Sequence, residues 1–451
     1  MHKILIKMKN LKTTIIITLS IILWPLGNSF AQNAETVLTQ NQARVTIDSI
    51  GNKLKANYIF PEVADKMIAA LENNFKKGNY KTITDPQEFA NQLTEDLQSV
   101  SHDKHLRVRF DPEGIAERER VVTAADSIKY LNDYIGSMQR RNFGFNKVEI
   151  LEGNIGYLDL RSFSDTEYAG ETAVAAMNFL SNTDAIIIDL RQNGGGSPAM
   201  IQLITSYLYG AEPVHLNNFY WRPSDTHTQT WTLPHVSGKR NPDADVFVLT
   251  SNRTFSAAEE FSYNLKNLER ATLIGETTGG GAHPGGSRAA TDQFTIWLPT
   301  GRAISPITKT NWEGVGVVPH IEVSADKALE VAKIKALETL IAKSNDAETV
   351  GFYDWSLQGL KTLSDPITLD ESILKSYVGA YGPRMITFEN GTLYYQRDSG
   401  TKYVLKPMKQ NEFMLVGLSY FRIKFLAENN KVIALQGRYE GGRTDKNLKT
   451  K

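Results

Sequence analysis

Ser256 is the side chain whose place in this sequence best suits nucleophilic chemistry. It follows an apolar run of strand length, 246–250, and precedes a segment, 257–268, whose apolar residues recur at helical spacing. A strand that turns sharply into a helix presents the junction side chain outward, and the free N–H groups of the helix point at what it attacks. Such a place suits a nucleophile whose reaction builds an oxyanion. The alternative is a plain helix cap, with Glu259 completing a capping box.

A glycine-rich turn strengthens the nucleophile interpretation. The sequence Gln192-Asn-Gly-Gly-Gly-Ser197 lies between a buried strand, 185–190, and a predicted helix, 198–209. Three glycines there let backbone N–H groups approach a ligand closely. A phosphate loop is the rival, but the Gly-Lys-Ser/Thr ending and the dinucleotide spacing are both missing. We therefore expect an oxyanion-binding turn.

Three histidines are candidates for the group that takes a proton from the serine. His102 and His105 stand just before a predicted strand, 106–110, and His283 lies in a second glycine turn, 277–286. A neutral imidazole can take a serine proton near pH 7. His102 and His105 could also form a metal pair, but no third ligand cluster lies nearby. We expect no metal, and ordinary loop histidines remain the alternative.

The elements around these residues predict three regions. Apolar spacing predicts three helices before residue 100, and strands alternate with helices from 154 to 275, which indicates a parallel sheet covered by helices. From Leu374 onward short strands and hairpin turns predict a small barrel or sandwich. We expect an N-terminal helical domain at 32–110, a core at 111–345, a polar linker at 346–372 and a small all-β accessory domain at 373–451.

Composition and the N-terminus limit the function. The 451 residues hold 50 basic and 50 acidic side chains, so no overall field steers nucleic acid. The lack of Cys excludes disulfides, thiolate metal sites and a cysteine nucleophile. Four lysines precede an apolar run, 14–27, and small residues at Ser29 and Ala31 predict a signal peptide, 1–31, rather than a retained anchor. We expect a periplasmic or extracellular protein without membrane contact after signal removal.

Several motifs, in their joint order and spacing, resemble the C-terminal processing (tail-specific) serine peptidases, and more closely their subgroup similar to repeats of interphotoreceptor retinoid-binding protein. The resemblance covers roughly residues 40 to 342 and includes the opening Asn57-Tyr-Ile-Phe-Pro61. The motifs are Ser101-His-Asp-Lys-His105-Leu, Asp189-Leu-Arg-Gln-Asn-Gly-Gly-Gly196, Thr254-Phe-Ser256-Ala-Ala-Glu-Glu, and Gly275-Glu-Thr-Thr-Gly-Gly-Gly-Ala-His-Pro284 with Gly314-Val-Gly-Val-Val-Pro319.

The resemblance implies an α/β core like the crotonase and Clp-protease superfold, with the N-terminal helical bundle packed at its front. Ser256 would be the nucleophile. The N–H groups of Ala257 and of a glycine in the 194–196 turn, with Gly195 first among them, would form the oxyanion hole.

The general base departs from the usual family pattern. These peptidases usually activate their serine with a Lys about 25 residues downstream, where Gly281 stands, and their PDZ module is missing. The related tricorn core proteases use a His and a downstream Glu, and His105 and Glu313 match them. We therefore expect His105 as general base, with Glu313 supporting it and His283 and His102 in reserve.

The sequence thus predicts an exported serine-type peptidase that hydrolyses peptides or unfolded protein by acyl transfer, without a cofactor. The alternative is a non-catalytic protein on the same scaffold that binds apolar ligands or peptides, and a third candidate is an esterase. The joint presence of Ser256 and His105 favours an enzyme, because a passive binder needs neither. The number of subunits is left open.

Overall fold

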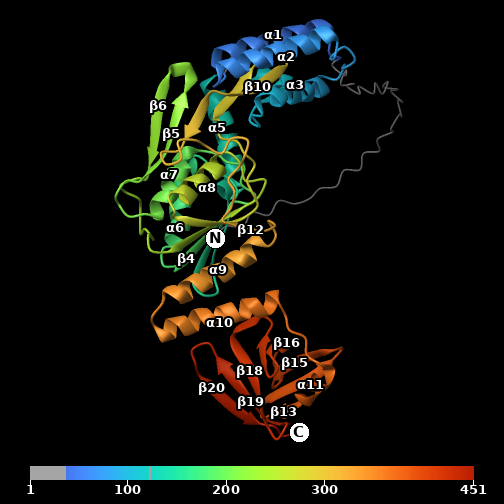
Figure 1. Cartoon of the computed structure of the whole chain (residues 1–451), viewed down its shortest axis with the longest axis vertical. Helices are drawn as coiled ribbons and strands as arrows, with labels where there is room; N and C mark the ends of the chain where they lie inside the picture. The colour runs from blue at the N-terminus through green and yellow to red at the C-terminus, as the bar shows by residue number, and fades with distance from the viewer. Residues whose placement is uncertain (1–36, 121–122, 451) are drawn as a thin grey trace, which may run out of the picture. The chain divides into compact units, whose positions relative to one another are not determined.

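Three helices and a small sheet form the N-terminal region. The computed structural model describes residues 37–120 and 123–450. Figure 1 shows the three helices, in blue, beside β10, and their apolar faces share one buried cluster with β1 and β10. The elements are α1 (Gln40–Asn57), α2 (Pro61–Lys77), α3 (Pro86–Ser101), β1 (Arg107–Phe110), β9 (Gly285–Ala289) and β10 (Phe294–Pro299). β1 and β9 both pair antiparallel with β10. The predicted three-helix unit is confirmed.

A six-stranded sheet forms the core, in the order β12-β8-β7-β4-β3-β2. All neighbours are parallel except β2, which is antiparallel to β3. The strands are β2 (Phe145–Leu151), β3 (Ile155–Leu160), β4 (Ala185–Asp189), β7 (Asp245–Thr250), β8 (Ala271–Gly275) and β12 (Ile321–Glu322). The parallel sheet predicted from the alternation of strands and helices is confirmed.

Helices cover both faces of this sheet. Ile186 and Ile188 of β4 pack with α6, α7 and α8, whereas Ala185 and Ile187 pack with α9. Burial on both faces explains why β4 is apolar throughout. The helices are α6 (Thr166–Phe179), α7 (Pro198–Tyr207), α8 (Ala257–Asn267) and α9 (Ala328–Lys343). The predicted α/β class of the core is confirmed.

Two connections carry further elements. The charged segment after β1 forms α4 (Pro112–Glu119) and α5 (Ala124–Gln139), and α5 buries none of its residues. The long insertion after α7 forms a hairpin of β5 (His215–Trp221) and β6 (Thr226–Trp231), which β11 (Gly301–Ile304) extends.

The C-terminal region is an eight-stranded antiparallel sheet in sequence order, as the short strands predicted. Its first and last strands approach each other through a bridge between Tyr381 and Lys449, which nearly closes a barrel. The strands are β13 (Gly379–Tyr381), β14 (Arg384–Glu389), β15 (Thr392–Arg397), β16 (Lys402–Lys409), β17 (Glu412–Leu415), β18 (Leu418–Glu428), β19 (Lys431–Tyr439) and β20 (Thr444–Leu448), after a short helix, α11 (Glu371–Ser376).

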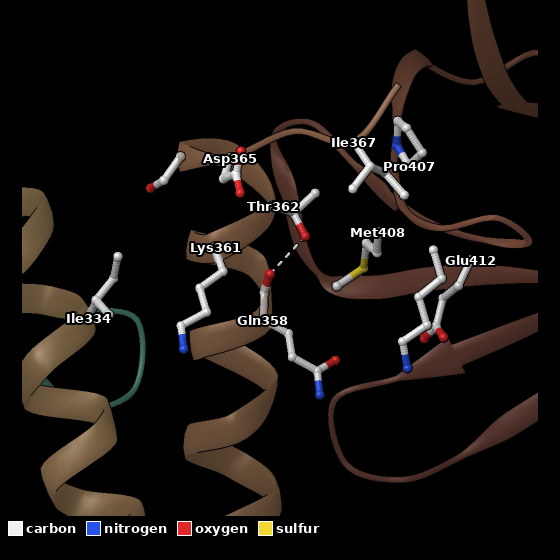
Figure 2. A pocket seen from close by; sticks show the side chains of 11 residues that line it. Ile334, Gln358, Lys361, Thr362, Asp365, Ile367, Pro407, Met408 and Glu412 are labelled. Atoms are coloured by element: carbon white, nitrogen blue, oxygen red, sulfur yellow. Dashed lines mark hydrogen bonds between the residues drawn. The ribbon is translucent and has the colours of Figure 1, made fainter. Parts of the chain in front are cut away.

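The segment expected as a polar linker, 346–372, is mostly helical. Its helix α10 (Ala347–Ser364) buries Tyr353 and Leu357 in the cluster that also holds α9. A hollow of about 450 Å³ lies between α9, α10 and the barrel. Figure 2 shows Ile334, Lys361 and Met408 around it, each from a different element. This hollow contains none of the candidate site residues.

Contacts join the chain from Leu38 onward into one compact unit, and the predicted domain boundaries fall within it. Among the helices of the described ranges, none is both long and apolar enough to cross a bilayer. The predicted signal peptide, 1–31, lies outside the described residues.

Candidate active site

The backbone at Ser256 is unusual for a helix cap. Ser256 is the N-cap residue of α8, with φ 56° and ψ −121°. An ordinary N-cap residue lies in the extended region. Positive φ is strained for a residue with a side chain, and such strain gathers at functional sites. Sharp strand-to-helix turns of this kind expose nucleophilic serines, so the backbone favours a nucleophile over a plain cap.

The glycine turn after β4 lies directly against this serine. A Cβ on Gly195 would come within 2.9 Å of Ser256 Cβ and 3.0 Å of Ala257 N, and Gly195 has φ +110°. Only glycine permits both the approach and the backbone conformation. Buried Asn193 holds the turn, because its Nδ2 donates to the Leu160 carbonyl at 2.9 Å and its Oδ1 accepts the Gly195 N–H at 2.8 Å.

The N–H groups near the serine that donate no hydrogen bond belong to residues named from the sequence, Ala257 and the 194–196 turn, but the favoured Gly195 is not among them. Ala257 lies where expected, and within the described ranges its N–H and that of Gly196 donate no hydrogen bond. The Gly195 N–H is already donated to Asn193. Gly195 therefore supplies the close approach, and exposed Gly196 supplies an N–H that a substrate could use.

His105 lies beside the residue that precedes the serine. It stands in the loop between α3 and β1, and the pairing of β1 with β10 brings that loop to the core. The ring centroids of His105 and Phe255 are 4.7 Å apart. Burial lowers the pKa of His105 to about 4, so its imidazole is neutral at pH 7. A neutral ring is the form that a general base needs.

The His105 ring packs closely against the backbone of Gly281. A Cβ on Gly281 would lie 2.8 Å from His105 Cε1 and would overlap the Phe255 ring. Real Cβ contacts are never this short. Any side chain at position 281 would therefore displace His105 or Phe255.

Asp103, which sequence reasoning missed, is the carboxylate near His105. Its Oδ1 accepts the His105 backbone N–H at 3.0 Å and lies 3.9 Å from His105 Nδ1, which is buried without a partner. Its Oδ2 lies 2.9 Å from His283 Nδ1, which is in turn 3.4 Å from Glu313 Oε2. Glu313 therefore contacts His283, and among the described residues no ion pair joins it to His105. The signal for Asp103 was its place two residues before His105.

The two reserve histidines and the lysine of α8 have other surroundings than His105. His102 is exposed at the C-cap of α3, with φ 57°. Lys266 of α8 donates to the Val318 carbonyl at 2.6 Å, so it is engaged away from the serine. His283 is buried and packs edge-on against Phe60, with ring centroids 5.2 Å apart.

Glu259 ties the serine to the second glycine turn. The Ser256 N–H donates to its Oε2 at 2.8 Å, so the backbone half of the expected capping box is present. The N–H groups of Gly280 and Gly281 donate to the same carboxylate at 2.6 and 2.8 Å. Burial raises the pKa of Glu259, although these hydrogen bonds oppose the shift.

A cavity of about 930 Å³ opens beside the first glycine turn. It is lined by Gly196 and Ser197, by the segment after β3 that includes Phe163, and by the C-terminal part of α5 that includes Tyr134. A cavity of this volume holds several amino-acid side chains. The uncommitted N–H of Gly196 thus borders a space large enough for a peptide segment.

Two family models match this chain. Residues 154–323 match the model of peptidase family S41, and residues 28–141 match the N-terminal domain of peptidase S41 in eukaryotic IRBP. Together the matched ranges take in well over half of the chain and include Asp103, His105, Gly196, Ser256 and Glu313.

Several solved structures align with this chain at low sequence identity. A protein of Parabacteroides merdae aligns with a TM-score of 0.45 and 19% identity over 65% of this chain and 96% of its own. A lipoprotein of Streptococcus agalactiae aligns with a TM-score of 0.42 and 14% identity, over 66% of this chain and 96% of its own. The photosystem II D1 C-terminal processing protease aligns with a TM-score of 0.41 and 13% identity, over 64% of this chain and 94% of its own.

Proposed function

Because this chain belongs to peptidase family S41, we propose that it is an exported serine peptidase with Ser256 as nucleophile and His105 as general base. The family supports a peptidase that acts on peptide substrates. The assignment of the two side chains is supported by the geometry around them.

The fit of His105 against Gly281 carries this proposal. Position 281 is where a Ser–Lys peptidase of this family would hold its Lys, and the His105 ring fills that space instead. The His105 imidazole therefore occupies the space of the usual lysine and also acts as the general base in its stead. The ring also packs on Phe255, next to the serine.

The reaction follows from these positions. Ser256 Oγ attacks the scissile carbonyl carbon while His105 Nε2 takes the hydroxyl proton, and the N–H groups of Ala257 and Gly196 stabilise the oxyanion. The imidazolium gives its proton to the leaving amine as the C–N bond breaks, which leaves an acyl ester on Ser256. Water then attacks the ester, loses a proton to His105, and the free acid and the serine hydroxyl are regenerated.

Asp103 acts as a positioning residue in this scheme. Its Oδ1 faces His105 Nδ1, so it favours the tautomer with hydrogen on Nδ1 and leaves Nε2 to accept the serine proton. The 3.9 Å separation shortens when the imidazolium forms, because opposite charges then attract.

The proposed substrate is a peptide or an unfolded protein segment that enters the cavity beside Gly196. The lysines and the apolar run at the N-terminus support export by a signal peptide, with a periplasmic or extracellular mature protein. N-terminal sequencing of the exported protein should begin at Gln32. A mature chain that retains Met1 would contradict the cleavage.

A serine-reactive fluorophosphonate probe tests the catalytic assignment. Wild type and the exposed control Ser287→Ala should be labelled, whereas Ser256→Ala should lose both labelling and cleavage of unfolded casein. His105→Ala should slow both by at least about 100-fold, and the exposed control His102→Asn should not. Full cleavage by Ser256→Ala would exclude the enzyme, and a loss in His283→Ala without a loss in His105→Ala would reassign the base.

A further inference from the structure

Two buried side chains and a partly buried one, from separate segments, converge near His105. They are Asp103 from the α3–β1 loop, His283 from the turn before β9, and Glu313 from the loop before β12. One nitrogen or oxygen atom of each lies within 4.8 Å of the others. Sequence reasoning expected no metal site, and these three residues are far apart in the chain.

The distances between these atoms suit a bound metal ion. Asp103 Oδ2 and His283 Nδ1 are 2.9 Å apart, and His283 Nδ1 and Glu313 Oε2 are 3.4 Å apart. A metal that holds nitrogen and oxygen ligands at about 2.0–2.1 Å in tetrahedral geometry separates them by roughly 3.3 Å. A small movement of the side chains would therefore let the three atoms serve as three of the four ligands of one ion.

The hydrogen-bonding capacity of the cluster is unbalanced. His283 Nδ1 can donate one hydrogen, yet it faces two carboxylates. The facing oxygens also accept from the Tyr58 hydroxyl, at 3.3 Å, and from the Ala282 N–H, which leaves each carboxylate one further oxygen. Glu313 Oε1 is buried and has no hydrogen-bond partner among the described residues. A divalent cation would give this oxygen and the two carboxylates a bonding partner.

A further buried nitrogen points into the same cluster. His105 has a side chain that is only 10% exposed, its Nδ1 has no hydrogen-bond partner, and that atom faces Asp103 at 3.9 Å. In the tautomer that carries its hydrogen on Nε2, this nitrogen has a lone pair of the kind that binds transition metals. The cluster therefore has a second imidazole nitrogen, that of His105, next to Asp103.

We propose that Asp103, His283 and Glu313 bind a divalent transition-metal ion. Nitrogen and carboxylate ligands suit Zn²⁺, which is the probe ion for this site. Glu313 is the most exposed ligand, at 16% of its side chain against 6% for His283 and 1% for Asp103, so the ion enters past Glu313.

The bound ion inhibits acylation of Ser256, and this consequence rests on the proposed function. The ion draws on the negative charge of Asp103, so that Asp103 stabilises the His105 imidazolium less. If His105 also joins the metal, the base itself is withdrawn. In either case the ion slows the proton transfer from the serine.

Calorimetric titration of the purified, EDTA-dialysed chain with Zn²⁺ tests binding without any need for activity. Wild type and His102→Asn should each bind one equivalent, and Zn²⁺ should raise their melting temperatures. Glu313→Gln and His283→Gln should bind at least about tenfold more weakly, with no such rise. Using two variants guards against one that fails to fold, and circular dichroism checks both.

The outcomes separate binding from inhibition. A lack of Zn²⁺ binding by wild type, or equal binding by both variants, would overturn the site. The rate of fluorophosphonate labelling should fall over the same Zn²⁺ range in wild type and recover with EDTA. Labelling that is unchanged at saturation would overturn the inhibition alone, and the lack of any labelling without Zn²⁺ would count against the proposed function, not the site.

Discussion

Glu259 accepts the backbone N–H of Gly281 at 2.8 Å, through the same oxygen that accepts the Ser256 N–H. Its other oxygen accepts the Gly280 N–H and the Thr278 hydroxyl, both at 2.6 Å. One fully buried carboxylate therefore joins the nucleophile to the second glycine turn. The strained backbone at Ser256 persists because several such bonds hold it.

Glu259→Gln should weaken both the fold and the site. An amide presents only one oxygen to four donors, and its NH₂ group would face backbone N–H groups. We expect a loss of about 2–4 kcal/mol in unfolding free energy, and a fall of roughly 100-fold in the rate of fluorophosphonate labelling, because a small displacement of the serine is costly. Urea unfolding and labelling kinetics measure these effects, and an unchanged labelling rate would contradict the role assigned to Glu259.

Glu260→Gln, one residue along α8, should have a different effect. Burial raises the pKa of Glu260 from 4.5 to about 7, and its Oε1 has no partner. The folded state binds the carboxyl proton of Glu260 more tightly than the unfolded state does. The protonated Glu260 therefore stabilises the folded state fully below pH 4.5, and this stabilisation is lost as pH rises through 7. Wild type should lose roughly 3 kcal/mol over that range from this group. Urea unfolding at several pH values should show that the unfolding free energy of Glu260→Gln depends less on pH than that of wild type. An equal dependence in both proteins would contradict the raised pKa of Glu260.

The sequence predicted most of the fold because most elements carry a local signal. The helices α1–α3 and the buried strands β4 and β7 show clear periodicity or apolar runs. Helix α10 was missed because its polar residues and two glycines hide the spacing of Tyr353 and Leu357. Strand β20 has no apolar alternation, and its pairing with β19 decides its structure.

The residues of the candidate site also fall into those with a local sequence signal and those without one. Ser256 and the glycine turn are local signals, whereas the approach of His105 to Phe255 depends on the pairing of β1 with β10, which no local pattern specifies. Only the family resemblance linked the two. The preference for Gly196 over Gly195 within the 194–196 turn could not be predicted either, because it depends on the hydrogen bond that the Gly195 N–H donates to Asn193 Oδ1.

Gly281→Ala should impair both catalysis and folding. The added Cβ would lie 2.8 Å from His105 Cε1, so the imidazole or the Phe255 ring must shift. We expect the rate of labelling of Ser256 to fall by at least about tenfold, with a loss of stability of roughly 1–3 kcal/mol from overpacking.

Gly286→Ala is the matched control in the same glycine run, because nothing lies within 4 Å of its added Cβ. It should change the labelling rate less than about twofold and unfolding free energy by less than about 0.5 kcal/mol. If the two variants label equally fast, the fit between Gly281 and His105 does not matter for the reaction.

Arg422 joins the C-terminal barrel to α10, so Arg422→Ala should loosen the barrel without harming the proposed site. Its guanidinium lies 3.8 Å from the Trp355 ring centroid, and it donates to Gln358 Oε1 at 3.2 Å and to the Trp355 carbonyl. It is only 3% exposed. Loss of these contacts should destabilise the protein by about 2–4 kcal/mol, which urea unfolding measures.

Arg443→Ala provides the control, because Arg443 also lies over an aromatic ring, Tyr439, at 4.0 Å, but is exposed. It should cost less than about 1 kcal/mol. Limited proteolysis should cut Arg422→Ala faster than either wild type or Arg443→Ala within 365–370, between α10 and α11. The rate of labelling of Ser256 should stay within about twofold of wild type in both variants, since neither arginine lies among the site residues; a large loss in Arg422→Ala would mean that the barrel's attachment controls the reaction.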